Sequence, residues 1–232
     1  MIEDILIIIP CHNEEKNIGL LLKNLKKNFK NILVVDDGST DKTREIAEKE
    51  EVFVISHNYC KGKGEALKTG FKFALEKDFP AVITIDGDGQ HLPEDAIKFV
   101  QVYRKKPNIG IIVGKRDILS KNMPLIRKIT NISMSFLISL ISFHWIPDTQ
   151  CGYRLINKEV LRKVKLYTSH FETESEILIK AGWFGFKIKS IPVETIYKEE
   201  KSKIKPLKDT LRFFKMIIFI LFPSLLKNGN KF

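Results

Sequence analysis

The chain has 232 residues and a formal net charge of +11, and 44% of its residues are hydrophobic. This length fits one large domain or a domain with an appendage, and the apolar content excludes a globally disordered chain. A strongly basic chain favours polyanionic partners such as nucleic acid, anionic lipid surfaces or phosphorylated small molecules. No arginine-rich recognition helix or aromatic RNA-binding signature is visible, so we expect no nucleic-acid partner.

Strand-like and helix-like segments alternate through about the first 115 residues. The expected strands are continuous apolar runs at residues 5–9, 32–35, 52–55, 81–85 and 109–113. Helical spacing of apolar residues fills the intervals, and polar residues follow the ends of the strands. This alternation predicts a doubly wound α/β fold, in which a mostly parallel sheet flanked by helices carries its chemistry at the carboxyl ends of the strands.

The strongest candidate for chemistry follows the fourth expected strand. Asp86 and Asp88 are separated by Gly87 at the end of an apolar run, and Gln90 adds a neutral oxygen two residues later. Two carboxylates at a strand end are suitable ligands for a hard cation such as Mg²⁺ or Mn²⁺, with water and phosphates completing its coordination. A glycine at position 87 lets the phosphates of a ligand approach the backbone. The alternative is a simple Asp-Gly turn that joins a strand to a helix.

Two further strand ends carry polar signals of different strength. Asp36 and Asp37 follow the second expected strand, where a carboxylate commonly accepts hydrogen bonds from a base or ribose; helix capping is the alternative. The segment Gly62-Lys63-Gly64 lacks the spacing of a P-loop, so we expect Lys63 to be a solvated loop lysine. Three arginines could together bind two phosphate groups; they are Arg116, Arg127 and Arg154.

The second half of the chain is more apolar and less regular. Residues 129–147 contain no Asp, Glu, Lys or Arg, and five large apolar residues form one stripe at helical spacing, namely Ile129, Ile132, Phe136, Leu140 and Phe143. We expect an amphipathic helix that packs on the core or lies in an interface rather than one that spans a bilayer. A polar loop with an apolar continuation is expected at 148–154, a helix from 171 and an edge strand at 186–191.

The C-terminal segment is both basic and apolar. We divide the chain into a domain at residues 1–200 and an appendage at 201–232, in which apolar residues recur at helical spacing from Pro206 to Leu226 with basic residues between them. This pattern predicts a helix on the cytoplasmic face of a membrane. The alternative is a helix buried against the core or against a second subunit.

The three cysteines of the chain are Cys11, Cys60 and Cys151. An odd and sparse set without zinc-finger spacing predicts reduced thiols in a cytosolic compartment, each acting as a small buried hydrophobe. The N-terminus leads directly into an apolar run and shows no signal-peptide pattern. We therefore expect a cytoplasmic protein that is peripheral on the cytoplasmic face of the membrane.

Four segments, in order and spacing, resemble the family-2 inverting glycosyltransferases of GT-A fold. They are residues 9–14, 35–41, 62–64 and 86–94, and the resemblance covers about residues 4–200. Within that family the chain is most similar to dolichyl- or polyprenyl-phosphate sugar transferases of the mannosyltransferase type. The Asp86-x-Asp88-x-Gln90 form, residues 148–154 and Ser202-Lys203 carry this narrower likeness.

The resemblance implies a role for each matching residue. It implies a nucleoside pocket lined by Pro10, His12, Glu14, Val35 and Asp37. It implies a Mg²⁺ or Mn²⁺ ion held against the diphosphate by Asp86, Asp88 and Gln90. Arg116 and Lys203 would contact the phosphates of the donor, and Arg127 the acceptor phosphate. One departure is that Tyr197 and Glu200 stand where the family usually offers an arginine and a glycine before Ser-Lys.

The expected reaction is transfer of a hexose, with inversion, from a nucleotide-diphosphate sugar of the GDP-mannose or UDP-glucose type to a polyprenyl or dolichyl phosphate. The basic, apolar tail favours this lipid acceptor, because a phosphate is already ionised and needs cations rather than a base. An alternative is a saccharide hydroxyl as acceptor, with Glu172 or Glu174 as the base. A non-catalytic nucleotide-sugar-binding protein is the alternative of another class. A homo-oligomer or a membrane-protein partner stays open.

Overall fold

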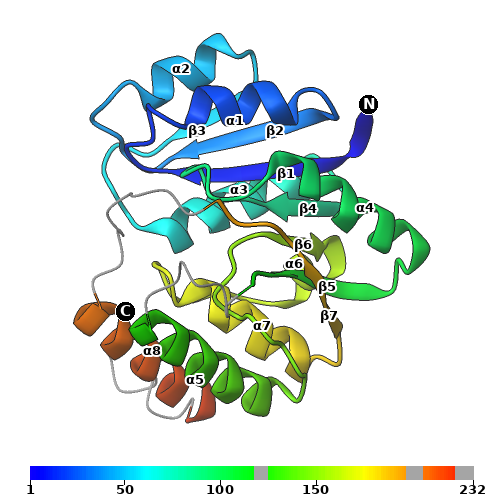
Figure 1. Ribbon diagram of the computed structural model, residues 1–232, viewed down its shortest axis with the longest axis vertical. Coiled ribbons are helices and arrows are strands. Elements are labelled where there is room, and N and C mark those ends of the chain that lie inside the picture. Colours follow the sequence, from blue (N-terminus) through cyan, green and yellow to red (C-terminus); the bar gives the residue numbers. More distant parts are fainter. Residues whose placement is uncertain (118–124, 197–205, 223–232) are drawn as a thin grey trace.

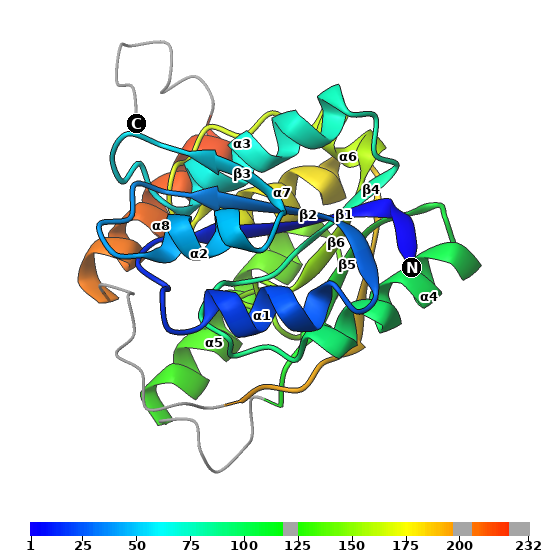
Figure 2. The same ribbon diagram turned by 90° about the horizontal axis from the view of Figure 1, so that it is seen from above.

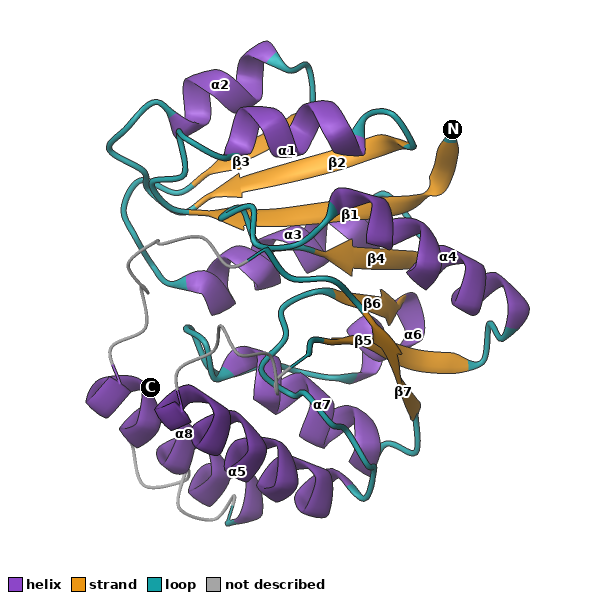
Figure 3. Cartoon of the chain, viewed as in Figure 1, coloured by secondary structure: helices purple, strands orange, loops and turns teal. Residues whose placement is uncertain are grey.

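The apolar runs of the chain assemble into one sheet of seven strands in the order β3-β2-β1-β4-β6-β5-β7 (Figures 1 and 3). The structure is a computed structural model and describes residues 1–117, 125–196 and 206–222. The strands are β1 (Ile2–Cys11), β2 (Phe29–Asp36), β3 (Phe53–Ser56), β4 (Ala81–Thr84), β5 (Ile109–Lys115), β6 (Arg154–Asn157) and β7 (Lys187–Pro192). Only β6 among these strands runs antiparallel to its neighbours, so the prediction of a mostly parallel sheet is confirmed.

Helices cover both faces of the sheet, as Figure 2 shows from above. The helices α1 (Ile18–Leu25), α2 (Thr43–Lys49) and α4 (Ala96–Lys105), preceded by the 3₁₀ turn Pro93–Asp95, lie on one face. The helices α3 (Lys63–Glu76), α6 (Lys158–Lys163) and α7 (Thr173–Trp183) lie on the other. Because both faces are covered, the central strands are buried on both sides, and Ile5 through Ile9 of β1 are fully buried.

The strand β6 and the helix α6 were not expected. Residues 148–154 were interpreted as a loop with an apolar continuation, yet Arg154 opens a strand that lies between β4 and β5. Four residues that begin with a charged side chain and end with Asn157 do not form a recognisable apolar run. The strand exists because its two neighbours supply the hydrogen-bond partners on both sides.

The helix α5 (Leu125–Ser142) packs against α7, and the side that it buries carries both Ile138 and small polar side chains. Ser135, Ser139 and Ser142 are buried, whereas the predicted apolar stripe is turned outward. Its members are 51% to 82% exposed, and they are Ile129, Ile132, Phe136, Leu140 and Phe143. The predicted stripe therefore lies on the outer side of the helix, whereas Ile138 on the inner side joins the core.

The helix α8 (Pro206–Leu221) lies with α5 at the end of the molecule that is lowest in Figure 1. Its buried side chains join the core cluster, and they are Phe213, Met216, Ile217 and Ile220. Its outward side chains are Leu211, Phe214, Ile218 and Leu221. We call these four, together with the stripe of α5, the apolar face. The expected continuation to Leu226 lies outside the described residues, and the division of the chain at residue 200 stays a prediction.

None of the helices in the described ranges combines the length and the apolar character that a membrane crossing needs.

Candidate active site

The carboxyl ends of β1, β2 and β4 meet at one edge of the sheet, which we call the site edge. Because β1 lies between the other two strands, the residues after β1 lie between those after β2 and those after β4. His12 shares a hydrogen bond of 2.9 Å between its Nδ1 and the backbone oxygen of Asp37. On the other side, a β-carbon on Gly87 would lie only 2.6 Å from the Cys11 sulfur. The sheet thus brings three of the predicted polar segments together.

Lys63, Asp86 and Glu174 form a cluster at the centre of the site edge. The Lys63 Nζ lies 2.6 Å from Asp86 Oδ1 and 3.0 Å from Glu174 Oε2. Burial alone would lower the pKa of Lys63, but the two carboxylates outweigh it and raise that pKa above its usual range. The prediction of a solvated loop lysine is therefore wrong. Its partner Glu174 comes from the start of α7, far away in the sequence.

The segment that precedes Lys63 is held by Asp37. The Asp37 carboxylate accepts hydrogen bonds from His57 Nδ1 at 2.7 Å and from the backbone amides of Lys61 and Gly62 at 2.9 and 2.7 Å. Burial would raise the pKa of Asp37, but these hydrogen bonds hold it below its usual value. Gly62 has a φ of +108°, a conformation that glycine adopts at little cost. Asp37 thereby fixes the turn from which α3 and Lys63 begin.

Cys60 belongs to the same segment and departs from its prediction. It is exposed, and its Sγ donates to Asp37 Oδ2 over 3.3 Å. Cys11 and Cys151 are buried, as expected. Burial raises the pKa of the Cys151 thiol to about 12, so this residue is an unreactive core side chain.

Asp86 and Asp88 have different electrostatic environments. Burial would raise the pKa of Asp86, yet Lys63, and after it His91 and Arg116, hold that pKa below its usual range. Burial and the nearby Asp86 carboxylate raise the pKa of Asp88 to about 6. Lys63 therefore only partly compensates the charge of the two neighbouring carboxylates.

The residues at this position fit a divalent cation that keeps several water or phosphate ligands. No group of three or more His, Cys, Asp and Glu side chains in the described ranges has the arrangement of a metal site. Asp86 and Asp88 would therefore need further oxygen ligands, and Gln90, water and phosphate are the available kinds. Gly152 leaves room beside Asp86, because a β-carbon there would lie 2.6 Å from Asp86 Oδ2.

Glu14 and its neighbours close the site edge on the β1 side. The Glu14 side chain is 8% exposed, and its charge adds to the raised pKa of Asp88, after burial and Asp86. Asn13 has a φ of +54° and joins the loops after β1 and β2, since its Oδ1 accepts from the Thr40 amide at 2.8 Å. The predicted nucleoside pocket would lie over these loops.

Arg116 is oriented by a buried carboxylate that has no local signal in the sequence. Its Nε and Nη2 donate to the two oxygens of Asp148 over 2.8 and 2.9 Å, and Asp148 is fully buried. The loop that holds Asp148 is bound in turn to α5, because Ser135 Oγ accepts from the Thr149 amide at 2.9 Å. The arrangement holds the guanidinium group at the end of β5. The predicted contact of Arg116 with phosphate stays a prediction.

Three predicted substrate contacts are placed in the interior instead. Arg154 is 1% exposed, and its guanidinium donates to the backbone oxygens of Thr149, Cys151 and Glu174. This geometry favours a structural role that fixes Glu174 and residues 149–151, rather than a phosphate contact. Val35 is fully buried between neighbouring strands, so its side chain does not line an open nucleoside pocket. Pro10 is likewise buried.

Several predicted site residues have side chains outside the described part of the chain. Arg127 falls in the first turn of α5, but its side chain is outside the described residues. Lys203, Tyr197 and Glu200 lie in the segment 197–205, which is also outside them. The described chain before that segment returns to the site edge, where Ile196 donates its amide to the backbone oxygen of Gln90 at 2.9 Å.

Comparisons with known proteins agree with this geometry. The family model described as glycosyl transferase family 2 matches residues 6–165. A UDP-N-acetylglucosamine–dolichyl-phosphate N-acetylglucosaminyltransferase of Methanococcus voltae is 36% identical over 84% of this chain and 86% of its own length. A dolichyl-phosphate beta-glucosyltransferase of Trichomonas vaginalis is 30% identical over 81% of this chain and 64% of its own length.

Among solved structures, glucosyl-3-phosphoglycerate synthase from Mycobacterium tuberculosis has the same fold, with a TM-score of 0.73 and 18% identity. The alignment covers 94% of this chain and 77% of that one. The predicted GT-A fold is therefore confirmed.

Proposed function

Because the chain belongs to glycosyl transferase family 2 and is a glycosyltransferase, we propose that it transfers a hexose from a nucleoside-diphosphate sugar to a polyprenyl phosphate, with inversion at the anomeric carbon. Its relatives named above carry names of dolichyl-phosphate transferases. The similar synthase was solved with Mn²⁺ and UDP, which supports a divalent cation and a nucleoside diphosphate at the corresponding edge of this sheet.

The exposed apolar face is the main support for a lipid acceptor. Phe136 and Leu140 of α5 are 61% and 63% exposed, while serines on the opposite side of the same helix are buried. A helix in contact with water would be expected to turn its large apolar residues toward the protein. Patches of this kind mark contacts with membranes or partners. Such a face would keep the isoprenoid chain of an acceptor in the membrane while its phosphate reaches the site edge.

Each group of the site edge has a role in this reaction. Asp86, Asp88 and Gln90 would hold a divalent cation, and when bound that ion would neutralise charge on the departing diphosphate. Lys63 keeps Asp86 and Glu174 in place. Arg116, fixed by Asp148, would bind a phosphate oxygen of the donor and stabilise the charge that grows on it. An acceptor phosphate is ionised near neutral pH and can attack the anomeric carbon without a general base.

The alternative acceptor, a saccharide hydroxyl, would need a base, and Glu174 is the nearest candidate. One oxygen of Glu174 already contacts the Lys63 ammonium at 3.0 Å. Glu172 is buried, and its Oε2 has no hydrogen-bond partner among the described residues. Neither arrangement is that of a carboxylate held ready for a hydroxyl, and we therefore favour the phosphate.

The placement of the protein follows from the same surface. We infer a peripheral position on the cytoplasmic face of the membrane, where free cysteines are stable and nucleotide sugars are available to the site. The charge of the C-terminal segment supports this placement, since basic residues near an anionic leaflet strengthen binding.

The test is to incubate the purified full chain with radiolabelled sugar nucleotides, a divalent cation and polyprenyl phosphate. Label that moves into the organic phase supports the proposal, whereas label found only on added saccharides contradicts it. The Asp86→Asn variant should lose at least about 100-fold in rate, because a group that stabilises the developing charge is removed. Full metal-dependent transfer by Asp86→Asn would exclude Asp86 as a metal ligand.

A further inference from the structure

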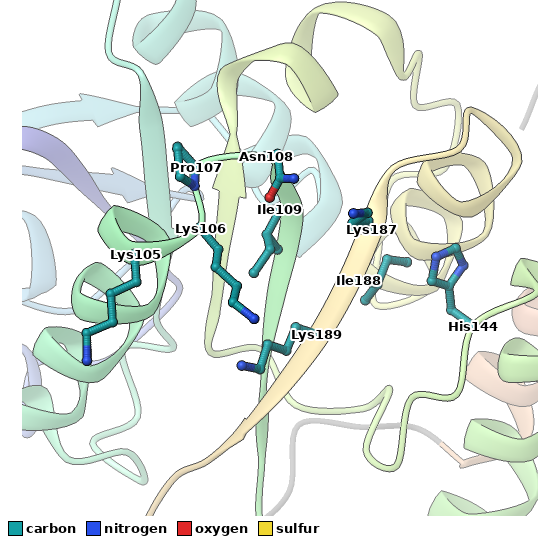
Figure 4. Close-up of a pocket in the computed structure, with 9 residues that line it drawn as sticks. All are labelled: Lys105, Lys106, Pro107, Asn108, Ile109, His144, Lys187, Ile188 and Lys189. Atoms are coloured by element: carbon teal, nitrogen blue, oxygen red, sulfur yellow. The ribbon is translucent and has the colours of Figure 1, made fainter.

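We propose that a lysine-lined groove, at the opposite edge of the sheet from the candidate site, binds the phosphate headgroups of anionic lipids. The groove encloses about 800 Å³. Its basic side chains are Lys105, Lys106, Lys187, Lys189 and His144, and Pro107, Asn108, Ile109 and Ile188 complete its lining (Figure 4). We call this the lysine groove. It depends on the proposed function only in requiring that the protein meets a membrane.

The lysine groove and the candidate active site lie at opposite ends of the sheet. Lys187 and Lys189 begin the edge strand β7, and Ile109 begins β5, its parallel neighbour. The site edge lies at the carboxyl ends of the parallel strands, so the groove is at the other end of the sheet. Lys105 and Lys106 reach it from the end of α4. Nothing in the transfer reaction uses these residues.

The charges of the lysine groove are not paired with carboxylates of the described residues. None of its four lysines has a carboxylate within 4.0 Å in the described part of the chain, whereas Lys158 nearby in the fold pairs with Asp78 at 3.0 Å. Lys187 and Lys189 are two residues apart on one strand and therefore point to the same side. In Figure 4 the side chains of Lys106 and Lys189 extend toward each other across the groove. Such a concentration of positive charge attracts anions.

Aromatic side chains beside the groove indicate that the anion belongs to a membrane. His144, which lines the groove, stands between Phe143 and Trp145, and these two are 82% and 74% exposed. Trp183 is also exposed and donates its Nε1 hydrogen to the backbone oxygen of Ile141 over 2.7 Å, so the end of α7 is joined to the same corner. Aromatic rings and lysines together are typical of the membrane–water interface.

The lysine groove continues the apolar face at one end. Phe143, the last member of the predicted stripe, directly follows α5 and is the neighbour of His144. A molecule that rests with α5 on a bilayer would therefore bring the groove to the depth of the headgroups. The apolar face would supply affinity for any bilayer, and the groove would supply preference for anionic ones. A soluble polyanion would gain nothing from the exposed rings.

The experiment compares binding of the full chain to phosphatidylcholine vesicles and to vesicles in which a quarter of the lipid is phosphatidylglycerol. We expect Lys187→Gln combined with Lys189→Gln to lose about 5-fold in affinity per lysine for the anionic vesicles, and to bind phosphatidylcholine as the wild type does. The matched control is Lys49→Gln with Lys77→Gln. Both of these lysines are exposed, and the change in net charge is the same.

The outcomes separate this inference from the proposed function. The inference would be overturned if the control pair lost as much affinity for anionic vesicles as the groove pair, or if the groove pair lost none. Neither result would contradict the role of the apolar face. Wild-type protein that binds neither kind of vesicle would overturn both. Release by millimolar inorganic phosphate, but not by chloride of equal ionic strength, would show a free-phosphate site instead of a headgroup site. Transfer to a short-chain, water-soluble acceptor should be unchanged in the groove pair.

Discussion

At the site edge, buried charges contact opposite charges, whereas along α5 and α8 large apolar side chains are turned toward the outside. Lys63 lies between two carboxylates, and Asp148 holds Arg116 with both oxygens. The site edge is therefore stabilised by contacts within the chain. The side chains of the apolar face are apolar and form no ion pairs. They are largely exposed, as Phe136 is at 61%. Changes at the first region should reduce the stability of the fold, and changes at the second should reduce association with a membrane.

The largest effect is expected from Lys63→Met, which leaves Asp86 and Glu174 without their counter-ion. Removing one partner of a largely buried ion pair destabilises a fold by about 3 kcal/mol. Urea denaturation would measure this loss in the free energy of unfolding. Added Mn²⁺ should raise the melting temperature of the variant more than that of the wild type, because the ion replaces the missing positive charge.

Lys68→Met is the matched control on the same helix. Lys68 pairs with Glu65 at 2.6 Å, but both side chains are near the surface, and such pairs contribute less than about 1 kcal/mol. If the two variants lose equal stability, the contrast between a buried and a surface ion pair disappears, and the central place of Lys63 in the site edge is refuted.

The apolar face should respond in the opposite way. Phe136→Gln with Leu140→Gln should change the free energy of unfolding by less than about 0.5 kcal/mol, since neither side chain contacts the core. Affinity for vesicles should fall on the order of 10-fold for each side chain, because apolar area is lost from the contact. Vesicle sedimentation and denaturation of the same samples would measure both quantities.

Leu20→Gln is the control for that pair, because Leu20 is 66% exposed on α1, away from α5 and α8. Vesicle binding should be unchanged in this control. A large loss of stability in the double variant would show that the α5 stripe packs against protein, and the contrast between the two regions would fail.

Acid should remove the stabilising contribution of His91 at the site edge, while protonation of Asp88, whose pKa is raised to about 6, acts in the opposite direction. Burial lowers the pKa of His91 to about 4, to which the charges of Arg116 and Lys63 also contribute, although Asp86 opposes them. The folded state therefore favours the neutral ring, and the unfolded state binds a proton near pH 6.5. The stabilising contribution is complete above pH 6.5 and is lost as the pH falls toward 4, by about 3 kcal/mol.

The measurement is the free energy of unfolding between pH 7 and pH 4 for the wild type and His91→Gln. The variant should be less stable at pH 7, because the ring contact with Tyr153 is lost, but it should show a shallower decline with acid. Parallel curves for the two proteins would mean that His91 is not the group that titrates in this range.

The predictability of the two regions from sequence also differs. The strands β1, β2 and β4 were predictable because buried parallel strands are continuous apolar runs, and the polar residues after them then share one edge. Which side of α5 faces the protein was not predictable, because an amphipathic pattern does not specify the side that packs against the core. Ser135 and Ser139 gave no sign of burial, since their partners are backbone and side-chain groups of a loop formed later in the chain.

Ionic partners were the least predictable part of the site. Glu174 meets Lys63 only because α7 packs beside the start of α3, where a β-carbon on Gly64 would lie 2.0 Å from Thr173 Oγ1. The strand β6 was not predicted from the sequence for a related reason. It depends on β4 and β5 for its hydrogen bonds and has only two apolar residues of its own, Leu155 and Ile156. The Lys63–Glu174 contact and the strand β6 both depend on residues far apart in the sequence. A local sequence pattern therefore does not predict them.

The smallest effect is expected where the two regions are connected. Ser135→Ala removes the hydrogen bond from the Thr149 amide to Ser135 Oγ, which should cost about 1 kcal/mol of stability. Because that loop also carries Asp148, and Asp148 orients Arg116, the rate of sugar transfer should fall several-fold with little change in vesicle binding. Ser133→Ala, on the exposed side of the same helix, is the control and should change neither quantity. If Ser135→Ala weakened vesicle binding and left transfer intact, α5 would serve the membrane contact alone, and its connection to the site edge would be refuted.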